Sequence, residues 1–286
     1  MTDRITVTAP AKLNLFLRVL AREDSGFHGL ETVFCRLALA DELVATRRPG
    51  EGVTLEVDGA DTGPVESNLA VRAASMVLSA LRTPFAVDLA LTKRSPVGAG
   101  LGGGSSDAAA ALRAVNALAG HAVPQHELLQ FAARLGADVP FLLSGAALAL
   151  AWGHGERILT LPRLPAAPVL LLHPPVAIPT AEAYRWLDQA RQDGFRRGAL
   201  ALDLDALGSW GSLARMSGND FESPVFGRHP EIRAAFEAVA GTRPLICRMT
   251  GSGSTIFGVY RTASDRDDAV MMLGRKFGRA VVTETA

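Results

Sequence analysis

Cysteine is scarce in this sequence, and long hydrophobic runs are missing. Only Cys35 and Cys247 occur, each inside an apolar stretch, which suits reduced core thiols better than a disulfide or a metal site. The longest apolar run, residues 141–152, is too short to cross a bilayer, and the first residues carry no signal-peptide pattern. We therefore expect a soluble, cytoplasmic protein with no membrane partner.

Charge of one sign is not in excess, because Lys plus Arg and Asp plus Glu each count 29. A net charge of zero gives no overall field that attracts nucleic acid, although a local basic patch is still allowed, and we expect no nucleic-acid partner. A chain of 286 residues, 48% of them hydrophobic, can form one large domain or two modest ones. The proline-dense segment 162–168 is the best boundary, which gives predicted domains of residues 1–162 and 163–286.

Helical and strand patterns alternate along the chain. Strands are predicted over residues 5–9, 13–19, 31–40, 53–57, 85–91, 146–151, 157–161, 169–173, 246–250, 256–260 and 279–283. Helices are predicted over residues 69–81, 108–118, 124–135, 180–190, 230–239 and 264–277. Segment 191–211 is a polar stretch. This interleaving indicates an α+β protein with a ferredoxin-like sandwich.

The stretch from Ser95 to Asp107 is the most informative part of the sequence, with five glycines within seven residues. Glycines permit tight turns and a close approach of the backbone to a ligand. The stretch leads into an alanine-rich helix, whose N-terminus offers free N–H groups and a favourable dipole to an anion. We interpret it as a phosphate cradle.

Three other interpretations of this stretch are weaker. A P-loop needs a lysine between Gly104 and Ser105, and none is there. Gly98, Gly100 and Gly103 fit the G-x-G-x-x-G pattern, but the acidic residue that a dinucleotide fold places about 20 residues later is missing. A flexible linker is not usually bracketed by a strand and a long helix.

A few polar residues are candidates for a functional site, although their spacing alone does not decide their role. Lys12 and Asn14 project from the same face of a strand whose other face carries Leu13, Leu15, Leu17 and Val19, and on spacing alone a solvated lysine is favoured. Asp138 follows an apolar helix, where it is either a helix cap or a partly desolvated functional group. The turn 24–29 carries Phe27 and His28, and a second Gly/Ser loop covers residues 250–255.

Segments 10–14, 96–106 and 250–254 resemble, in kind and order, the three motifs of the GHMP kinases, which bind ATP in a glycine-rich loop unlike the P-loop. Within that family the chain most resembles the kinases of 4-diphosphocytidyl-2-C-methyl-D-erythritol. Five segments carry this closer likeness: Pro10–Leu15, Gly26–His28, Gly100–Ser106, Leu135–Pro140 and Asn219–Glu222. The resemblance implies a two-domain GHMP kinase fold of the α+β class, with a ribosomal-protein-S5-domain-2-like N-terminal domain and a ferredoxin-like α/β sandwich at the C-terminus.

The resemblance also implies ATP-dependent phosphorylation of the 2-hydroxyl of 4-diphosphocytidyl-2-C-methyl-D-erythritol, a small-molecule substrate. This reaction belongs to the non-mevalonate isoprenoid pathway, and Mg²⁺ is the implied cofactor. It implies Lys12 and Asp138 as the catalytic pair. The implied ATP-binding residues are Asn68, Lys93, Pro96, Val97, Gly98, Ala99, Gly100, Leu101, Gly102, Gly103, Gly104, Ser105 and Ser106. The implied substrate-binding residues are Asn14, Phe27, His28 and Tyr184; Phe27 stands where many relatives have Tyr, which removes a hydroxyl but keeps a stacking face.

Two alternatives stay open from the sequence. One is another GHMP small-molecule kinase of the homoserine or mevalonate type, and the other is a nucleotide or sugar sensor that keeps the fold without chemistry. The Phe27–His28 turn argues against the first, and the presence of both Lys12 and Asp138 argues against the second. We expect a monomer or a homodimer.

Overall fold

The structure is a computed structural model that describes residues 3–24, 26–195 and 202–286. It contains two β-sheets with helices packed on them, so the expected α+β class is confirmed. Ser25 of the predicted turn and residues 196–201 of the predicted polar stretch lie outside the described residues. In the part of the chain that the structure describes, no helix is long and apolar enough to cross a membrane.

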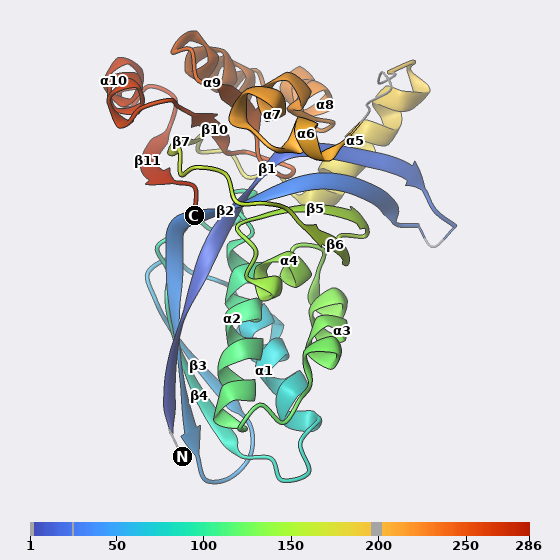
Figure 1. The fold of residues 1–286 in the computed structure, drawn as a ribbon, viewed down its shortest axis with the longest axis vertical. Coiled ribbons are helices and arrows are strands. Elements are labelled where there is room, and N and C mark those ends of the chain that lie inside the picture. The colour runs from blue at the N-terminus through green and yellow to red at the C-terminus, as the bar shows by residue number, and fades with distance from the viewer. Residues whose placement is uncertain (1–2, 25, 196–201) are drawn as a thin grey trace.

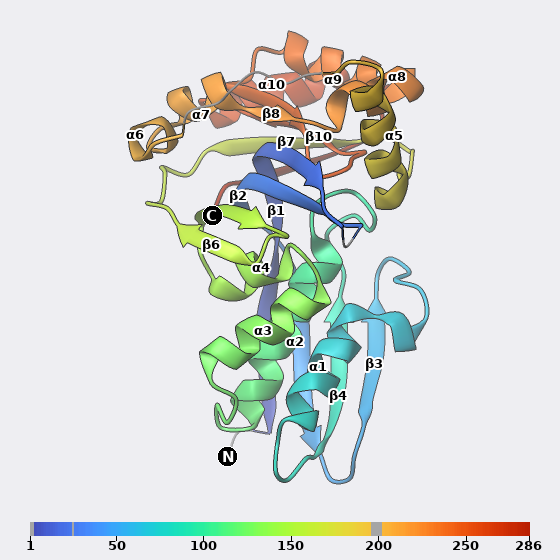
Figure 2. The same cartoon turned by 90° about the vertical axis from the view of Figure 1, so that its right-hand side faces the viewer.

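Among the described residues, the larger sheet has seven strands (Figure 1). They are β1 (Arg4–Arg22), β2 (His28–Arg48), β3 (Val53–Asp58), β4 (Ala86–Thr92), β5 (Leu148–Gly153), β6 (Arg157–Thr160) and β8 (Gly218–Asn219). Their order is β3-β4-β2-β1-β8, with β5 paired to β2 and β6 paired to β5. Five helices belong to this part: η1 (Val65–Ser67), α1 (Leu69–Ser79), α2 (Gly103–Leu118), α3 (Gln125–Leu135) and α4 (Val139–Ser144). Helices α1 to α4 share one apolar core with β2 and β4, and Figure 2 shows these helices together beside the long strands.

The smaller sheet has four antiparallel strands in the described chain, in the order β11-β7-β10-β9. They are β7 (Pro168–His173), β9 (Ile246–Met249), β10 (Ile256–Val259) and β11 (Arg279–Glu284). The helices of this part are α5 (Thr180–Gln192), α6 (Leu204–Leu207), α7 (Trp210–Met216), α8 (Glu222–Arg228), α9 (Pro230–Gly241) and α10 (Ala263–Leu273). One apolar cluster joins β7 and β10 to β1 and β2, and another joins them to α5, α8, α9 and α10. This sheet is therefore a layer between the long hairpin and its own helices (Figure 2).

The hairpin of β1 and β2 runs through both parts and brings the predicted site residues to their meeting point (Figure 1). Its register shifts between Pro10 and Lys12 and again between Asn14 and Phe16. A bulge bends a strand and re-aims its side chains. The predicted single apolar face of β1 is therefore wrong beyond Leu15, because Phe16 joins the inter-sheet cluster while Leu17 packs with the outer one.

Several boundaries differ from the sequence prediction for local reasons. Helix α2 begins at Gly103 instead of residue 108, because Gly102 adopts a left-handed conformation (φ +70°) that lets the glycine stretch itself form the first helical turn. The apolar run after Asp138 is the short helix α4. Helices α6, α7 and α8 and strand β8 were not predicted, since helices of four to seven residues span at most two turns and a two-residue strand shows no alternation.

Candidate active site

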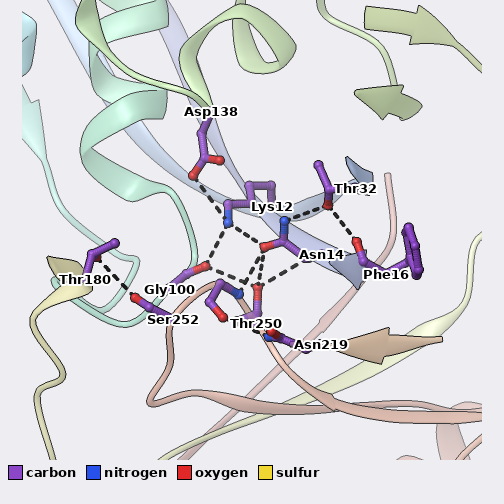
Figure 3. A network of polar contacts seen from close by, with 11 residues as sticks. Lys12, Asn14, Phe16, Thr32, Gly100, Asp138, Thr180, Asn219, Thr250 and Ser252 are labelled. Carbon is purple, nitrogen blue, oxygen red and sulfur yellow. Dashed lines mark hydrogen bonds and ion pairs between the residues drawn. The ribbon is translucent and has the colours of Figure 1, made fainter. Parts of the chain in front are cut away.

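Lys12 is the centre of the polar network between the two parts of the molecule (Figure 3). Its Nζ donates hydrogen bonds to Asn14 Oδ1 at 2.8 Å and to the carbonyl of Gly100 at 3.0 Å, and it forms an ion pair with Asp138 Oδ2 at 3.3 Å. An ammonium carries three N–H donors; two of them bind oxygens of Asn14 and Gly100, and the charge is paired with Asp138. The Lys12 side chain is only 3% exposed, so this charge is buried and fully satisfied.

Asp138 occupies the N-cap position of α4, but its side chain does not cap that helix. Its carboxylate turns instead to Lys12 and stays 26% exposed. Of the two interpretations that the sequence left open, the geometry therefore fits a functional carboxylate better than a helix cap. A carboxylate held beside a buried ammonium and still open to a cavity can accept a proton from a ligand.

Gly102 lies against this ion pair. A Cβ at its position would stand 2.9 Å from Lys12 Cε and 3.3 Å from Asp138 Oδ2, and its φ of +70° is one that L side chains rarely adopt. The glycine stretch must therefore lack a side chain here for the Lys12–Asp138 pair to form.

Asn14 ties the Lys12 network to the second Gly/Ser loop. Besides Lys12, its Oδ1 accepts a hydrogen bond from the Gly251 amide at 3.0 Å, and its Nδ2 donates to Thr32 Oγ1 at 2.9 Å. Thr250 Oγ1 donates to the Gly100 carbonyl at 3.1 Å, so this loop contacts the glycine stretch as well. Most of the hydrogen-bonding capacity of Asn14 is thus used within the protein, in positioning Lys12.

The glycine stretch lines a cavity of about 310 Å³ at the N-terminus of α2. Its lining includes Thr62, Ser67, Asn68, Leu69, Lys93, residues 96–105 and Asp107. Asn68 caps α1 by accepting a hydrogen bond from the Ala70 amide. The hydroxyl of Ser106 is buried and donates to the carbonyl of Pro10 at 2.8 Å, so of the two predicted serines only Ser105 lines the cavity.

Lys93 lies in a buried cluster at the floor of the same cavity. Its Nζ forms ion pairs with Asp41 and with Asp107, and its side chain is 2% exposed. Burial by itself would raise the pKa of Asp41, but hydrogen bonds from Lys93, Ser95 and Arg94 hold that pKa below its usual value. Burial raises the pKa of Asp107 to about 6 against the attraction of Lys93, and its Oδ1 has no hydrogen-bond partner. Sequence reasoning assigned no role to Asp41 or Asp107.

The aromatic residues form the third region of the site. The rings of His28 and Tyr184 stack at 5.0 Å, and Phe221 meets Tyr184 edge-on at 5.0 Å. Burial, with the nearby Asp138 charge, raises the pKa of the Tyr184 hydroxyl. Phe27 is 67% exposed and its ring lies 5.7 Å from that of His154. Phe27, His28 and Tyr184 line one cavity of about 770 Å³.

A small cavity of about 210 Å³ around Lys12 and Asp138 connects these regions. It shares Gly100, Gly102 and Ser105 with the glycine-stretch cavity, and Leu30, Ala137, Thr180 and Tyr184 with the aromatic cavity. The three cavities therefore adjoin one another, with the ion pair in the middle one. Another cavity, of about 810 Å³, lies between the C-terminal ends of α1 and α2 and is lined by none of the predicted site residues.

Comparison with known proteins matches two family models to this chain: the N-terminal domain of GHMP kinases over residues 68–146 and the C-terminal domain of GHMP kinases over residues 200–280. A 4-diphosphocytidyl-2-C-methyl-D-erythritol kinase of Solibacter usitatus is 39% identical, over 96% of this chain and 86% of its own. The enzyme of the same name from Geobacter sulfurreducens is 35% identical over 98% of each chain.

Solved structures agree with these matches. A crystal structure of 4-(cytidine 5′-diphospho)-2C-methyl-D-erythritol kinase superposes with a TM-score of 0.82 at 37% identity, and 99% of each chain is covered. A homoserine kinase from Cytophaga hutchinsonii has a TM-score of 0.72 at 20% identity, covering 100% of this chain and 95% of its own, which shows a shared fold.

Proposed function

The chain belongs to the GHMP kinase family, and from this membership we propose that it transfers the γ-phosphoryl group of ATP to the 2-hydroxyl of 4-diphosphocytidyl-2-C-methyl-D-erythritol. The products are the 2-phosphate and ADP, in the non-mevalonate synthesis of isoprenoid precursors. The observation that carries this proposal is the buried Lys12–Asp138 pair between a phosphate cradle and an aromatic cavity. Relatives named for this substrate match nearly the whole chain.

Asp138 acts as the general base in this reaction. The 2-hydroxyl is tertiary, hence hindered and a weak nucleophile, so it must be aligned with the γ-phosphorus and lose its proton as the new bond forms. The exposed quarter of the Asp138 side chain faces the small central cavity, where the hydroxyl would lie. Lys12 forms the ion pair that holds the Asp138 carboxylate in place, and it offsets negative charge on the transferring oxygens.

ATP binds with its phosphates along the glycine stretch. The backbone N–H groups of residues 98–105 and the N-terminus of α2 form the cradle, and Ser105 adds a hydroxyl. Asn68 and Lys93 line the same cavity, on the side where the proposal places the adenosine. Because Lys93 is neutralised by two buried carboxylates, it supports the floor of the cradle more than it attracts the phosphates.

We propose that Mg²⁺ accompanies ATP. Among residues 3–24, 26–195 and 202–286, no group of three or more His, Cys, Asp or Glu side chains could hold a metal ion by itself. Mg²⁺ usually binds through substrate phosphates and one or two protein oxygens, which agrees with such a site. The Ser105 hydroxyl and the unpartnered Oδ1 of Asp107 are the oxygens beside the cradle that fit this role. When bound, Mg²⁺ neutralises charge on the phosphates.

The cytidine end of the substrate occupies the aromatic cavity. Phe27, exposed at its rim, offers a ring face on which a base can stack, and His28 reads the edge of the base. Tyr184 has one ring face against His28, so it supports the pocket and, at the central cavity, borders the polyol. Asn14 contributes mainly by holding Lys12.

Two further features belong to the proposal. We place the domain boundary between residues 162 and 163, since the chain leaves the larger sheet after β6 and starts the smaller one with β7. We also propose a cytoplasmic enzyme, because both cysteines are free, as is usual in a reducing compartment. We propose that it is active as a monomer or homodimer.

The test is ATP consumption by the purified protein with the cytidyl substrate, compared with homoserine, mevalonate and galactose. We expect turnover with the cytidyl substrate alone. Turnover only with another alcohol would refute the substrate and keep the kinase reaction. A folded protein that binds ATP but turns over none of the four would refute catalysis and favour a sensor.

A further inference from the structure

Asp188 holds the imidazole of His28 in one orientation. Its Oδ1 lies 2.8 Å from His28 Nε2, and both side chains are largely withdrawn from solvent, at 30% and 6% exposed. Asp188 is one helical turn after Tyr184 on α5, so the residue that stacks on the imidazole and the residue that binds its edge share one helix face. The ring is fixed from two directions.

This contact decides which nitrogen of His28 carries a proton. A carboxylate only accepts hydrogen bonds, so Nε2 must be the N–H donor, and in the neutral ring Nδ1 is then an acceptor. Among the described residues Nδ1 has no hydrogen-bond partner, and it is not an enclosed atom. His28 lines the aromatic cavity, which leaves Nδ1 available to a ligand there.

We propose that Asp188 is a positioning residue that sets the preference for cytosine over uracil, an inference that rests on the cytidine site proposed above. Cytosine carries an exocyclic amine, a hydrogen-bond donor, where uracil carries a carbonyl oxygen, an acceptor. An acceptor at Nδ1 can bind the amine of cytosine, but it repels the carbonyl oxygen of uracil, which is also an acceptor. By fixing the tautomer, Asp188 makes His28 discriminate between the two bases.

The test is calorimetric binding of cytidine diphosphate and uridine diphosphate with the ATP site filled by a non-hydrolysable ATP analogue. The variants are Asp188→Ala, the conservative Asp188→Glu, and Asp193→Ala as the control, an exposed carboxylate at the end of the same helix. We expect the affinity ratio of cytidine over uridine diphosphate to fall about tenfold in Asp188→Ala, to recover in part in Asp188→Glu, and to stay unchanged in the control.

Steady-state kinetics add a second readout. Asp188→Ala should raise KM for the cytidyl substrate about tenfold and leave kcat and KM for ATP within twofold. An affinity ratio in Asp188→Ala within twofold of wild type would overturn the inference, as would a wild type that binds both diphosphates equally. A wild type that prefers cytidine diphosphate but turns over no cytidyl substrate would refute the proposed function and leave the inference standing.

Discussion

Replacement of Asp138 by Asn tests the catalytic pair most cleanly, because Asn has the same shape but cannot take a proton from the substrate. General-base catalysis contributes roughly 10²–10⁴-fold to a rate, so kcat should fall by about that factor, or roughly 3–5 kcal/mol of transition-state stabilisation. Lys12 keeps its hydrogen bonds to Asn14 and Gly100 and gains the amide oxygen as a neutral third acceptor. The fold and the phosphate cradle should therefore persist, with KM for ATP within about threefold.

The assay is initial-rate ADP release at saturating ATP and cytidyl substrate, with the melting temperature of each variant measured in parallel. Asp193→Asn is the matched control, since it removes an exposed carboxylate that lines none of the three site cavities. We expect the control to keep wild-type kcat. If Asp138→Asn retained kcat within tenfold of wild type while folded, Asp138 would not be the base, and the reasoning from its contact with Lys12 would be refuted.

Three further predictions concern buried contacts of the glycine stretch and of the Lys93 cluster. Gly102→Ala should lower the melting temperature by several degrees and abolish turnover, because the new Cβ would displace the Lys12 side chain. Gly104→Ala is the control and should keep the wild-type melting temperature, because its Cβ would meet only a distant Leu side-chain atom. Thr250→Val should cost about 1–3 kcal/mol of unfolding free energy in urea titration, because the buried hydroxyl that binds the Gly100 carbonyl is lost; an unchanged midpoint would contradict this. Because the pKa of Asp107 is raised from 3.8 to about 6 in the folded protein, its contribution to stability is fully present below pH 3.8 and is lost as pH rises to about 6. Relative to Asp107→Asn, the wild type should therefore lose up to about 3 kcal/mol of unfolding free energy across that interval, measured by urea titration at each pH, and a constant difference would contradict the assignment.

The local features of the site could be predicted from sequence, because each depends on neighbouring residues. Glycine spacing and an alanine-rich segment predict the tight turn into α2, and strand alternation places Lys12 and Asn14 on one face. The Asn68 cap depends on contacts two residues apart. Most helices and strands were located for the same reason.

The remaining features depend on contacts between distant segments. Asp41 meets Lys93 across 52 positions of the chain, and nothing near either residue indicates that they are neighbours. The Asp188–His28 contact spans 160 positions. The bulge at Leu15 follows from how two long strands pair, which a single strand pattern cannot show. Spacing alone also left Asp138 between helix cap and functional group, and its ion pair with Lys12, which comes from a distant segment, favours the second.

The measurement that tests the central claim most directly is phosphorus NMR of the reaction of the purified protein with ATP, Mg²⁺ and 4-diphosphocytidyl-2-C-methyl-D-erythritol. The account predicts one new phosphomonoester, on the 2-oxygen, formed in step with ADP, with the cytidine diphosphate resonances retained. It also predicts that the Asp138→Asn variant forms this product at least about 100-fold more slowly. A phosphate on another hydroxyl, or ADP and free phosphate without a phosphorylated substrate, would contradict it.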